Sequence, residues 1–205
     1  MLEHYHYLQQ KFDDKISGKF LDRYLNSLDP QHIHFLQSDL TEFEQYRTKL
    51  DDLTLRGDTT PAYEIATRFL HRLEQRVAYV NELLKTEKLE FTGDERVTLN
   101  RHELPYPKDI TEARQLWRDR LRYEMLEEKL SKGKPKSAGG ESGNLKPANE
   151  IAKEIVDLLT KRYARILKTF KDWDADNFLE VYLTALARVY DPHSDYFGKS
   201  QLENF

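Results

Sequence analysis

Apolar residues recur every three or four positions along most of this chain, and this period restricts the fold more than any other feature. The clearest case follows Thr60 and Pro61, a helix cap with proline at the first helical position. Because this spacing places the apolar side chains on one helical face, it predicts an amphipathic helix of about six or seven turns. Its apolar positions are Ile65, Phe69, Leu73, Val77, Val80 and Leu84.

The same period predicts further helices on both sides of this one. One or two helices run from Tyr5 to the Asp29-Pro30 stop, with Gly18 as a plausible break. Ser38 is expected to cap a helix that ends near Gly57. Three more are expected after residue 108, from Asp109 to about 130, from Pro147 to about 170, and from about Asp174 to Asp191-Pro192.

The helical period disappears between Lys88 and Lys108. The segments 89–91 and 97–99 alternate like short strands around Gly93-Asp94. The sequence therefore predicts a mainly all-α fold, a multi-helix bundle of about six to eight helices, which allows a small β-hairpin near residues 88–105.

Gly, Ser and Pro are concentrated between Lys132 and Lys146, which is the clearest linker in the sequence. We therefore expect four regions. Residues 1–131 form an N-terminal helical platform, and 132–146 a flexible linker or loop. Residues 147–190 form a C-terminal helix pair that packs on the platform, and 191–205 form a connector.

Composition excludes several function classes. The net charge is −4, and acidic and basic residues alternate without a basic stripe, so nucleic acid is not expected as a partner. The absence of cysteine excludes disulfides, thiolate nucleophiles and cysteine zinc sites. No apolar run approaches the length of a membrane-spanning helix.

No motif predicts a catalytic, cofactor-binding or metal-binding residue. A nucleophile elbow, a phosphate-binding loop and a dinucleotide fingerprint are all missing. His4 and His6, like His32 and His34, are spaced to share one face of a strand, but both pairs lie in helical or turn contexts. We therefore interpret these histidines as structural or surface residues and expect no cofactor.

The segment from Tyr190 to Phe197 stands out from its surroundings. Pro192 restricts Asp191, and Ser194 or Asp195 can satisfy backbone donors, so a helix stop explains the pattern. Asp191, His193 and Asp195 also resemble a calcium or zinc ligand set, but one short turn rarely supplies a whole coordination shell.

Two blocks of sequence resemble the N-terminal helical region of bacterial tail-specific (carboxy-terminal processing) proteases. The first block is Phe20–Leu25 with Ser27–Pro30 and Phe35–Asp39, extended by Phe43, Tyr46 and Arg47. The second is Tyr190–Phe197 followed by Ser200–Phe205, and it resembles the passage that leads into the PDZ domain. The residues that carry the resemblance are Arg23, Tyr24, Leu25, Asp29, Asp191, Pro192, His193, Ser194, Tyr196 and Phe197.

The resemblance implies an exported, periplasmic serine-type peptidase that degrades or trims proteins from their C-termini with a Ser/Lys dyad. The dyad and the PDZ domain would follow Phe205, so this chain would be a non-catalytic scaffold that packs against those domains. In some family members such a region docks a helical-repeat lipoprotein adaptor. Self-association into a homodimer through an exposed apolar patch is a further expectation.

Two alternatives remain open at the level of sequence. A free-standing helical interaction module, for example an adaptor without a protease, fits the helical pattern and charge balance equally well. A metal-dependent enzyme that uses His32 and His34 is the weaker alternative. The sequence does not name a substrate or an adaptor.

Overall fold

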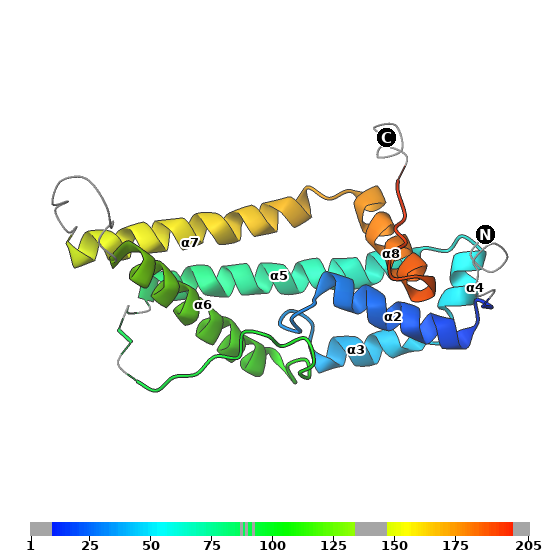
Figure 1. The fold of residues 1–205 in the computed structure, drawn as a ribbon, viewed down its shortest axis with the longest axis horizontal. Coiled ribbons are helices and arrows are strands. Elements are labelled where there is room, and N and C mark those ends of the chain that lie inside the picture. The colour runs from blue at the N-terminus through cyan, green and yellow to red at the C-terminus, as the bar shows by residue number, and fades with distance from the viewer. Residues whose placement is uncertain (1–9, 87, 89, 92, 134–146, 199–205) are drawn as a thin grey trace.

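The computed structural model describes residues 10–86, 88, 90–91, 93–133 and 147–198, and within them the fold is all-helical (Figure 1). The elements are α2 (Asp14–Leu28), α3 (Gln37–Phe43), the 3-10 turn η1 (Glu44–Tyr46), α4 (Leu50–Leu55), α5 (Thr60–Thr86), α6 (Ile110–Gly133), α7 (Ala148–Lys171) and α8 (Ala175–Tyr190). These seven α-helices confirm the predicted fold class and number of helices. None of them is long and apolar enough to cross a membrane, as far as the described residues extend.

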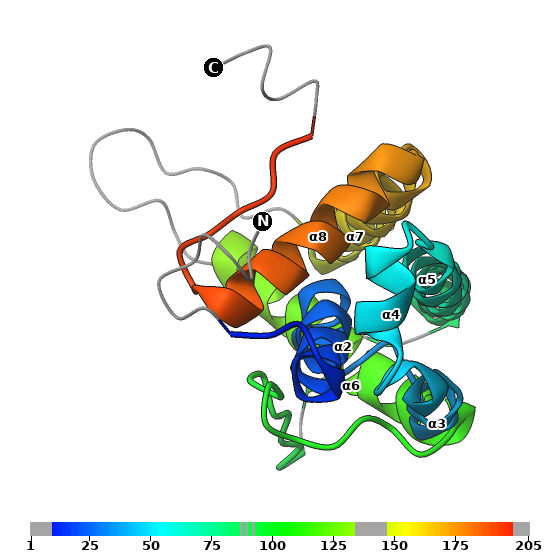
Figure 2. The ribbon, with the colours of Figure 1, turned by 90° about the vertical axis from the view of Figure 1, so that its right-hand side faces the viewer.

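The long helix α5 runs through the middle of the molecule and contacts α6, α7 and α8. Figure 1 shows α7 alongside α5, with α6 crossing both near one end of the molecule. At the other end α2 packs against α8 and α4, and Figure 2 shows these three helices in end view with α5 to their right. The bundle is therefore elongated, with α5 as the element that joins its two ends.

One hydrophobic core joins residues on both sides of the predicted linker. Its largest members include Phe20 and Tyr24 of α2, Phe69 of α5, and Tyr182 of α8, each at most 1% exposed. Burying one such side chain contributes about 1.5–3 kcal/mol. Because the core contains residues from α2, α5, α6, α7 and α8, these helices fold around a shared interior. Of the predicted linker 132–146, Lys132 and Gly133 are the last residues of α6, and 134–146 lie outside the described residues.

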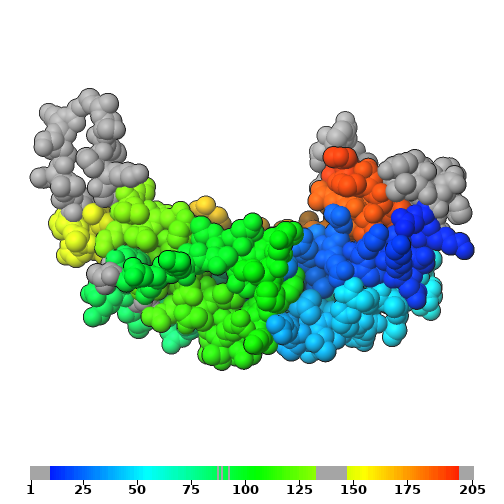
Figure 3. Space-filling view, turned by 60° about the horizontal axis from the view of Figure 1, so that its bottom comes forward, coloured from blue at the N-terminus to red at the C-terminus, as the bar shows by residue number. Residues whose placement is uncertain are grey.

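The expected β-hairpin is not found, which corrects one part of the fold prediction. The described residues between Lys88 and Pro105 contain no strand; Leu89 and Thr92 lie outside them. Side chains of neighbouring elements bind the backbone of this segment instead. Arg122 donates to the Glu90 carbonyl, and the Arg101 N–H donates to Gln31. An isolated two-stranded hairpin is only marginally stable, so the contacts with Arg122 and Gln31 determine the backbone conformation of this segment. Figure 3 shows the surface of the green region, 93–133, against the blue α2–α3 region.

The region from Ser38 to Gly57 also differs from the prediction of a single helix. Helix α3 begins at Gln37, not after a Ser38 cap, and Asp39 reaches back to accept a hydrogen bond from the Leu36 N–H. The chain then breaks into η1 and α4. The Ser17 hydroxyl accepts from the Asp51 N–H in the first turn of α4, so a distant side chain sets the new start. Gly57, with φ 76°, ends α4 as expected.

Helix α2 continues through Gly18, so of the two possibilities, one helix or two with a break at Gly18, the structure has one across this glycine. Gly18 is buried, and its carbonyl accepts a hydrogen bond from the Arg47 guanidinium. The same guanidinium pairs with Asp22 of α2.

Replacing Gly18 with alanine is expected to raise the free energy of unfolding by about 0.5–1 kcal/mol. The new Cβ would lie 3.5 Å from Arg47 Nη1, an ordinary contact, and alanine favours the helix. Gly57→Ala is the control of opposite sign, with a loss of about 1 kcal/mol because of its positive φ. Urea unfolding measures both changes. Equal losses in the two variants would contradict this account of Gly18.

Candidate functional site

Asp29, one of the residues that carry the resemblance, lies at the centre of the loop between α2 and α3. Its side chain is 1% exposed and accepts hydrogen bonds from the N–H groups of Ile33, His34 and Phe35 at 2.7–3.1 Å. The His34 ring contributes Nδ1 at 3.1 Å. His32 turns the chain with a φ of 51°, and its N–H donates to the Asp29 carbonyl. One carboxylate therefore fixes the course of the whole loop.

His34 extends this contact to two long helices. Arg76 of α5 lies with Nη1 3.2 Å from His34 Nε2, and its Nη2 donates to the Tyr163 hydroxyl of α7 at 3.3 Å. Arginine only donates, so Nε2 must accept and Nδ1 must carry the proton that His34 donates to Asp29. Asp29, His34, Arg76 and Tyr163 thus form a continuous chain of hydrogen bonds, called here the Asp29 relay.

The relay shifts the pKa values of its acidic and imidazole groups. Burial opposes ionisation of Asp29, but the hydrogen bonds from His34 and from the loop backbone outweigh it and lower the pKa of Asp29. Burial lowers the pKa of His34, and the Arg76 guanidinium adds to this effect, while Asp29 only partly offsets it. Asp29 is therefore ionised and His34 neutral near pH 7, which agrees with the hydrogen-bond directions.

A second buried carboxylate, Asp39, fastens α3 to α5. Asp39 is fully buried, and Arg72 binds it with Nε and Nη2, each at 2.8 Å. Arg68 also pairs with it and reaches Glu42. A two-point arginine–carboxylate pair fixes orientation as well as distance. Asp39 and Asp29 together hold the loop that carries Phe35 into the core.

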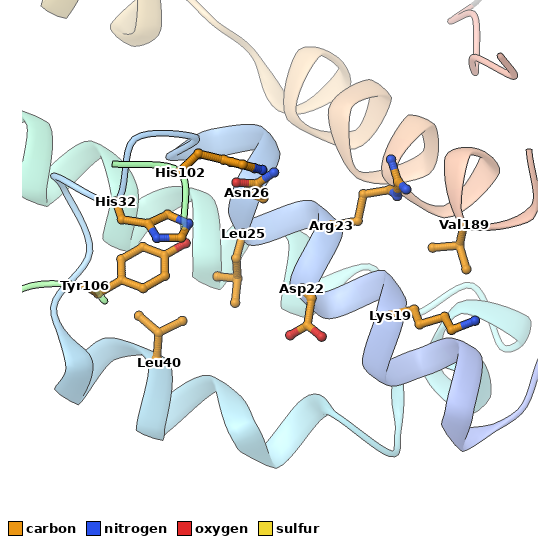
Figure 4. A pocket seen from close by; sticks show the side chains of 10 residues that line it. All are labelled: Lys19, Asp22, Arg23, Leu25, Asn26, His32, Leu40, His102, Tyr106 and Val189. Atoms are coloured by element: carbon orange, nitrogen blue, oxygen red, sulfur yellow. The ribbon is translucent and has the colours of Figure 1, made fainter. Parts of the chain in front are cut away.

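The block from Arg23 to Leu25 divides between the interior and the surface. Tyr24 is buried, donates from its hydroxyl to the Ala62 carbonyl at 2.9 Å, and packs edge-on against Tyr182. Leu25 is buried as well. Arg23 is exposed and extends from α2 in the opposite direction to Asp22 (Figure 4).

An open groove of about 790 Å³ runs beside this face of α2 (Figure 4). The His32 ring stacks on Tyr106 at 4.0 Å, and its Nδ1 lies 2.6 Å from the Leu104 carbonyl. The remaining lining residues come from α2, α3, the 102–106 segment and α8. They are Lys19, Asp22, Arg23, Leu25, Asn26, Leu40, His102 and Val189.

His32 and His34 do not converge on a shared centre. His32 faces Tyr106, whereas His34 faces Asp29 and Arg76. No group of three or more histidine, aspartate or glutamate side chains is placed to hold a metal ion in the described part of the chain. His4 and His6 lie outside that part.

The C-terminal block forms a compact turn folded back on α8. Asp191 accepts from the His193 N–H and from the Ser194 hydroxyl, and Asp195 pairs with Arg188 at 2.7 Å. The Tyr196 N–H donates to the Thr184 hydroxyl. Asp191 and Asp195 therefore bind groups of their own turn and helix, as in the predicted helix stop. Pro192, His193, Tyr196 and Phe197 are exposed, and 199–205 lie outside the described residues.

Sequence reasoning missed the roles of Arg76 and Tyr163. Arg76 occupies the apolar face of α5 between Leu73 and Val77, and it is only 8% exposed. A charged residue within an apolar stripe signals a buried polar contact, because an unpaired charge there would be costly. The partner, 87 positions further along the chain, could not be read from local spacing.

Comparisons with known proteins identify the family of the chain. The family described as "Tail specific protease N-terminal domain" matches residues 1–200. A tail-specific protease of Haemophilus influenzae is 32% identical over 201 residues, which cover 98% of this chain. The chain therefore belongs to the tail-specific protease family, and it matches the N-terminal domain. It spans about a quarter, 26%, of the length of that relative.

We expect the stability of the chain to fall as the pH decreases from about 7 to about 5. The unfolded state takes up a proton on His34 below the ordinary histidine pKa of 6.5, whereas the folded state resists protonation. The unfolded state therefore binds more protons, and the loss reaches at most about 1.4 kcal/mol per pH unit. Urea unfolding at a series of pH values measures this loss of stability. Asp29 and Asp39 do not obscure it, because their carboxylates change the pH dependence of stability only near and below the ordinary aspartate pKa of 3.8.

His34→Gln is expected to be less stable near pH 7 and to show a flatter dependence over this range. His71→Gln, at an exposed position of α5, is the matched control and should keep the slope. An unchanged slope in His34→Gln would contradict the neutral, buried state of His34.

Proposed function

We propose that this chain is the non-catalytic scaffold of a periplasmic serine endopeptidase that degrades or trims proteins from their C-termini. The observation that carries the proposal is the family match over residues 1–200, together with the small share, 26%, of the relative's length. The remaining three quarters leave room for a PDZ domain and a Ser/Lys catalytic domain. The enzymatic activity of the whole protein would therefore reside outside this chain.

The buried polar contacts of the bundle are consistent with a scaffold role for the helices. The polar centre of the bundle is used for internal contacts: Asp29 binds its own loop, and Asp39 binds Arg72. These groups fix the helices relative to one another, as a scaffold requires.

The C-terminal turn supports a connector role for residues 191–205. Asp191 has extended backbone angles, φ −147° and ψ 123°, which suit a residue before proline. Arg188 and Thr184 of α8 bind this turn, so the turn would fix the direction in which the chain leaves α8 toward the next domain. Tyr196 and Phe197, 41% and 44% exposed, offer apolar surface to that domain.

The proposal also includes contacts between this chain and other domains or proteins. Leu158 and Ile166 of α7 are exposed apolar residues that a neighbouring domain, a helical-repeat lipoprotein adaptor or a second copy of the chain could cover. A free-standing helical adaptor is the second candidate function. Membership in a protease family over nearly the whole chain favours the first.

In the full-length enzyme, the double variant Pro192→Ala/His193→Ala is expected to lower kcat/KM for a substrate with an unstructured C-terminal tail by about threefold to tenfold. The physical reason is that Asp191 loses its proline restriction, so the following domain is held less firmly. Lys153→Ala/Lys161→Ala, at exposed positions of α7, is the matched control. Unchanged kinetics together with an unchanged melting temperature would contradict the connector role.

A further inference from the structure

One part of α7 carries a concentration of positive charge that differs from the rest of the chain. Residues 158–171 contain five cationic residues and no acidic one, although the whole chain has a net charge of −4. The five are Lys161, Arg162, Arg165, Lys168 and Lys171. The mixture of acidic and basic residues that holds for the sequence as a whole therefore does not extend to this part of α7.

Two of the five cations are used within the bundle. Arg162 binds Glu128 of α6 at 2.5 Å, and Lys171 binds Glu74 of α5 at 2.6 Å. The other three form no ion pair with any residue that the structure describes. Their charge is therefore available to a partner outside the chain.

The three unpaired cations form a single row along the helix, called here the α7 stripe. Lys161, Arg165 and Lys168 follow one another at intervals of four and three residues, which places them on one face. All three are exposed, whereas Leu159 and Tyr163 on the opposite face are buried in the core. Figure 1 shows α7 along one edge of the molecule, so the stripe points away from the bundle.

The position of the stripe favours a charged surface over a peptide as its partner. Residues of α7 line neither the groove beside α2 nor the cavity of about 590 Å³ between α3 and α5. A row of exposed cations on the outside of a helix fits a plane of negative charges. Clusters of lysine and arginine on amphipathic helices are typical of binding to anionic lipid headgroups.

Two apolar side chains add to this match. Leu158 and Ile166 flank the stripe and are 38% and 39% exposed. Apolar residues beside a row of cations can enter the boundary between headgroups and acyl chains, which adds buried apolar area to the electrostatic attraction.

We propose that the α7 stripe binds the chain to membranes that expose anionic lipid headgroups. The side chains of Lys161, Arg165 and Lys168 contact the headgroup phosphates. Each cation near such a membrane contributes about 1 kcal/mol, which is about fivefold in the partition coefficient. The proposal does not depend on the proposed protease function.

Co-sedimentation of the chain with lipid vesicles tests the proposal. We expect binding to vesicles of equal parts phosphatidylglycerol and phosphatidylcholine, and at least about tenfold weaker binding to vesicles of uncharged phosphatidylcholine alone. Binding to the charged vesicles should also weaken at least about tenfold between about 0.01 M and about 0.15 M salt, because the Debye length falls from about 30 to about 8 Å. Equal binding to both kinds of vesicle, or binding to neither, would overturn the proposal.

The triple variant Lys161→Gln/Arg165→Gln/Lys168→Gln locates the site. It should bind the charged vesicles about thirtyfold to a hundredfold more weakly than the parent chain. Its melting temperature should change little, because the positions are exposed and glutamine is a good helix former. Unchanged binding by this variant would show that the stripe is not the site.

The matched control removes the same charge elsewhere. Lys11→Gln/Lys15→Gln/Lys19→Gln replaces three exposed lysines at and before α2, and it should change vesicle binding by less than about threefold. Equal losses in the two triple variants would show that net charge and not the stripe drives binding. Saturable binding of poly-glutamate by a chain that does not bind the charged vesicles would assign the stripe to an acidic protein segment and would also overturn the proposal.

Discussion

The buried carboxylate of Asp29 is the interaction on which the rest of the structure depends. It accepts three backbone N–H groups within seven residues of chain, a task that no neutral side chain of its size performs. The loop it fixes then positions α6, since the Ile33 carbonyl accepts from Trp117 Nε1 and the Gln37 N–H donates to the Pro107 carbonyl. Through His34 and Arg76, the same carboxylate is linked to α5 and α7.

Sequence reasoning recovered the features that local physics controls. Asp174 caps α8 together with Asn177, and Asp109 accepts from two N–H groups in the first turn of α6. The missed features all depend on distant partners. Helix α4 begins where it does because the Ser17 hydroxyl, 34 positions earlier, accepts from the Asp51 N–H. No pattern within one segment could reveal such contacts.

At the candidate site the sequence points to Asp29 but not to its partners His34, Arg76 and Tyr163. Asp29 belongs to a block that resembles a family motif, and in the structure its carboxylate holds the backbone of the α2–α3 loop. Tyr24 and Leu25 of the same block are core residues, whereas Arg23 and four residues of the C-terminal turn are exposed. The two blocks that carry the resemblance therefore combine residues that build the bundle with residues on its surface.

The free energy of unfolding of Asp29→Asn tests the central claim most directly, with Asp172→Asn as a control at an exposed aspartate. An asparagine keeps the size but loses the charge and turns one acceptor into a donor that faces the loop N–H groups. The account predicts a loss of about 2–4 kcal/mol in urea unfolding near pH 7, against less than about 0.5 kcal/mol for the control. Equal, small changes in both variants would show that the bundle does not depend on the Asp29 carboxylate.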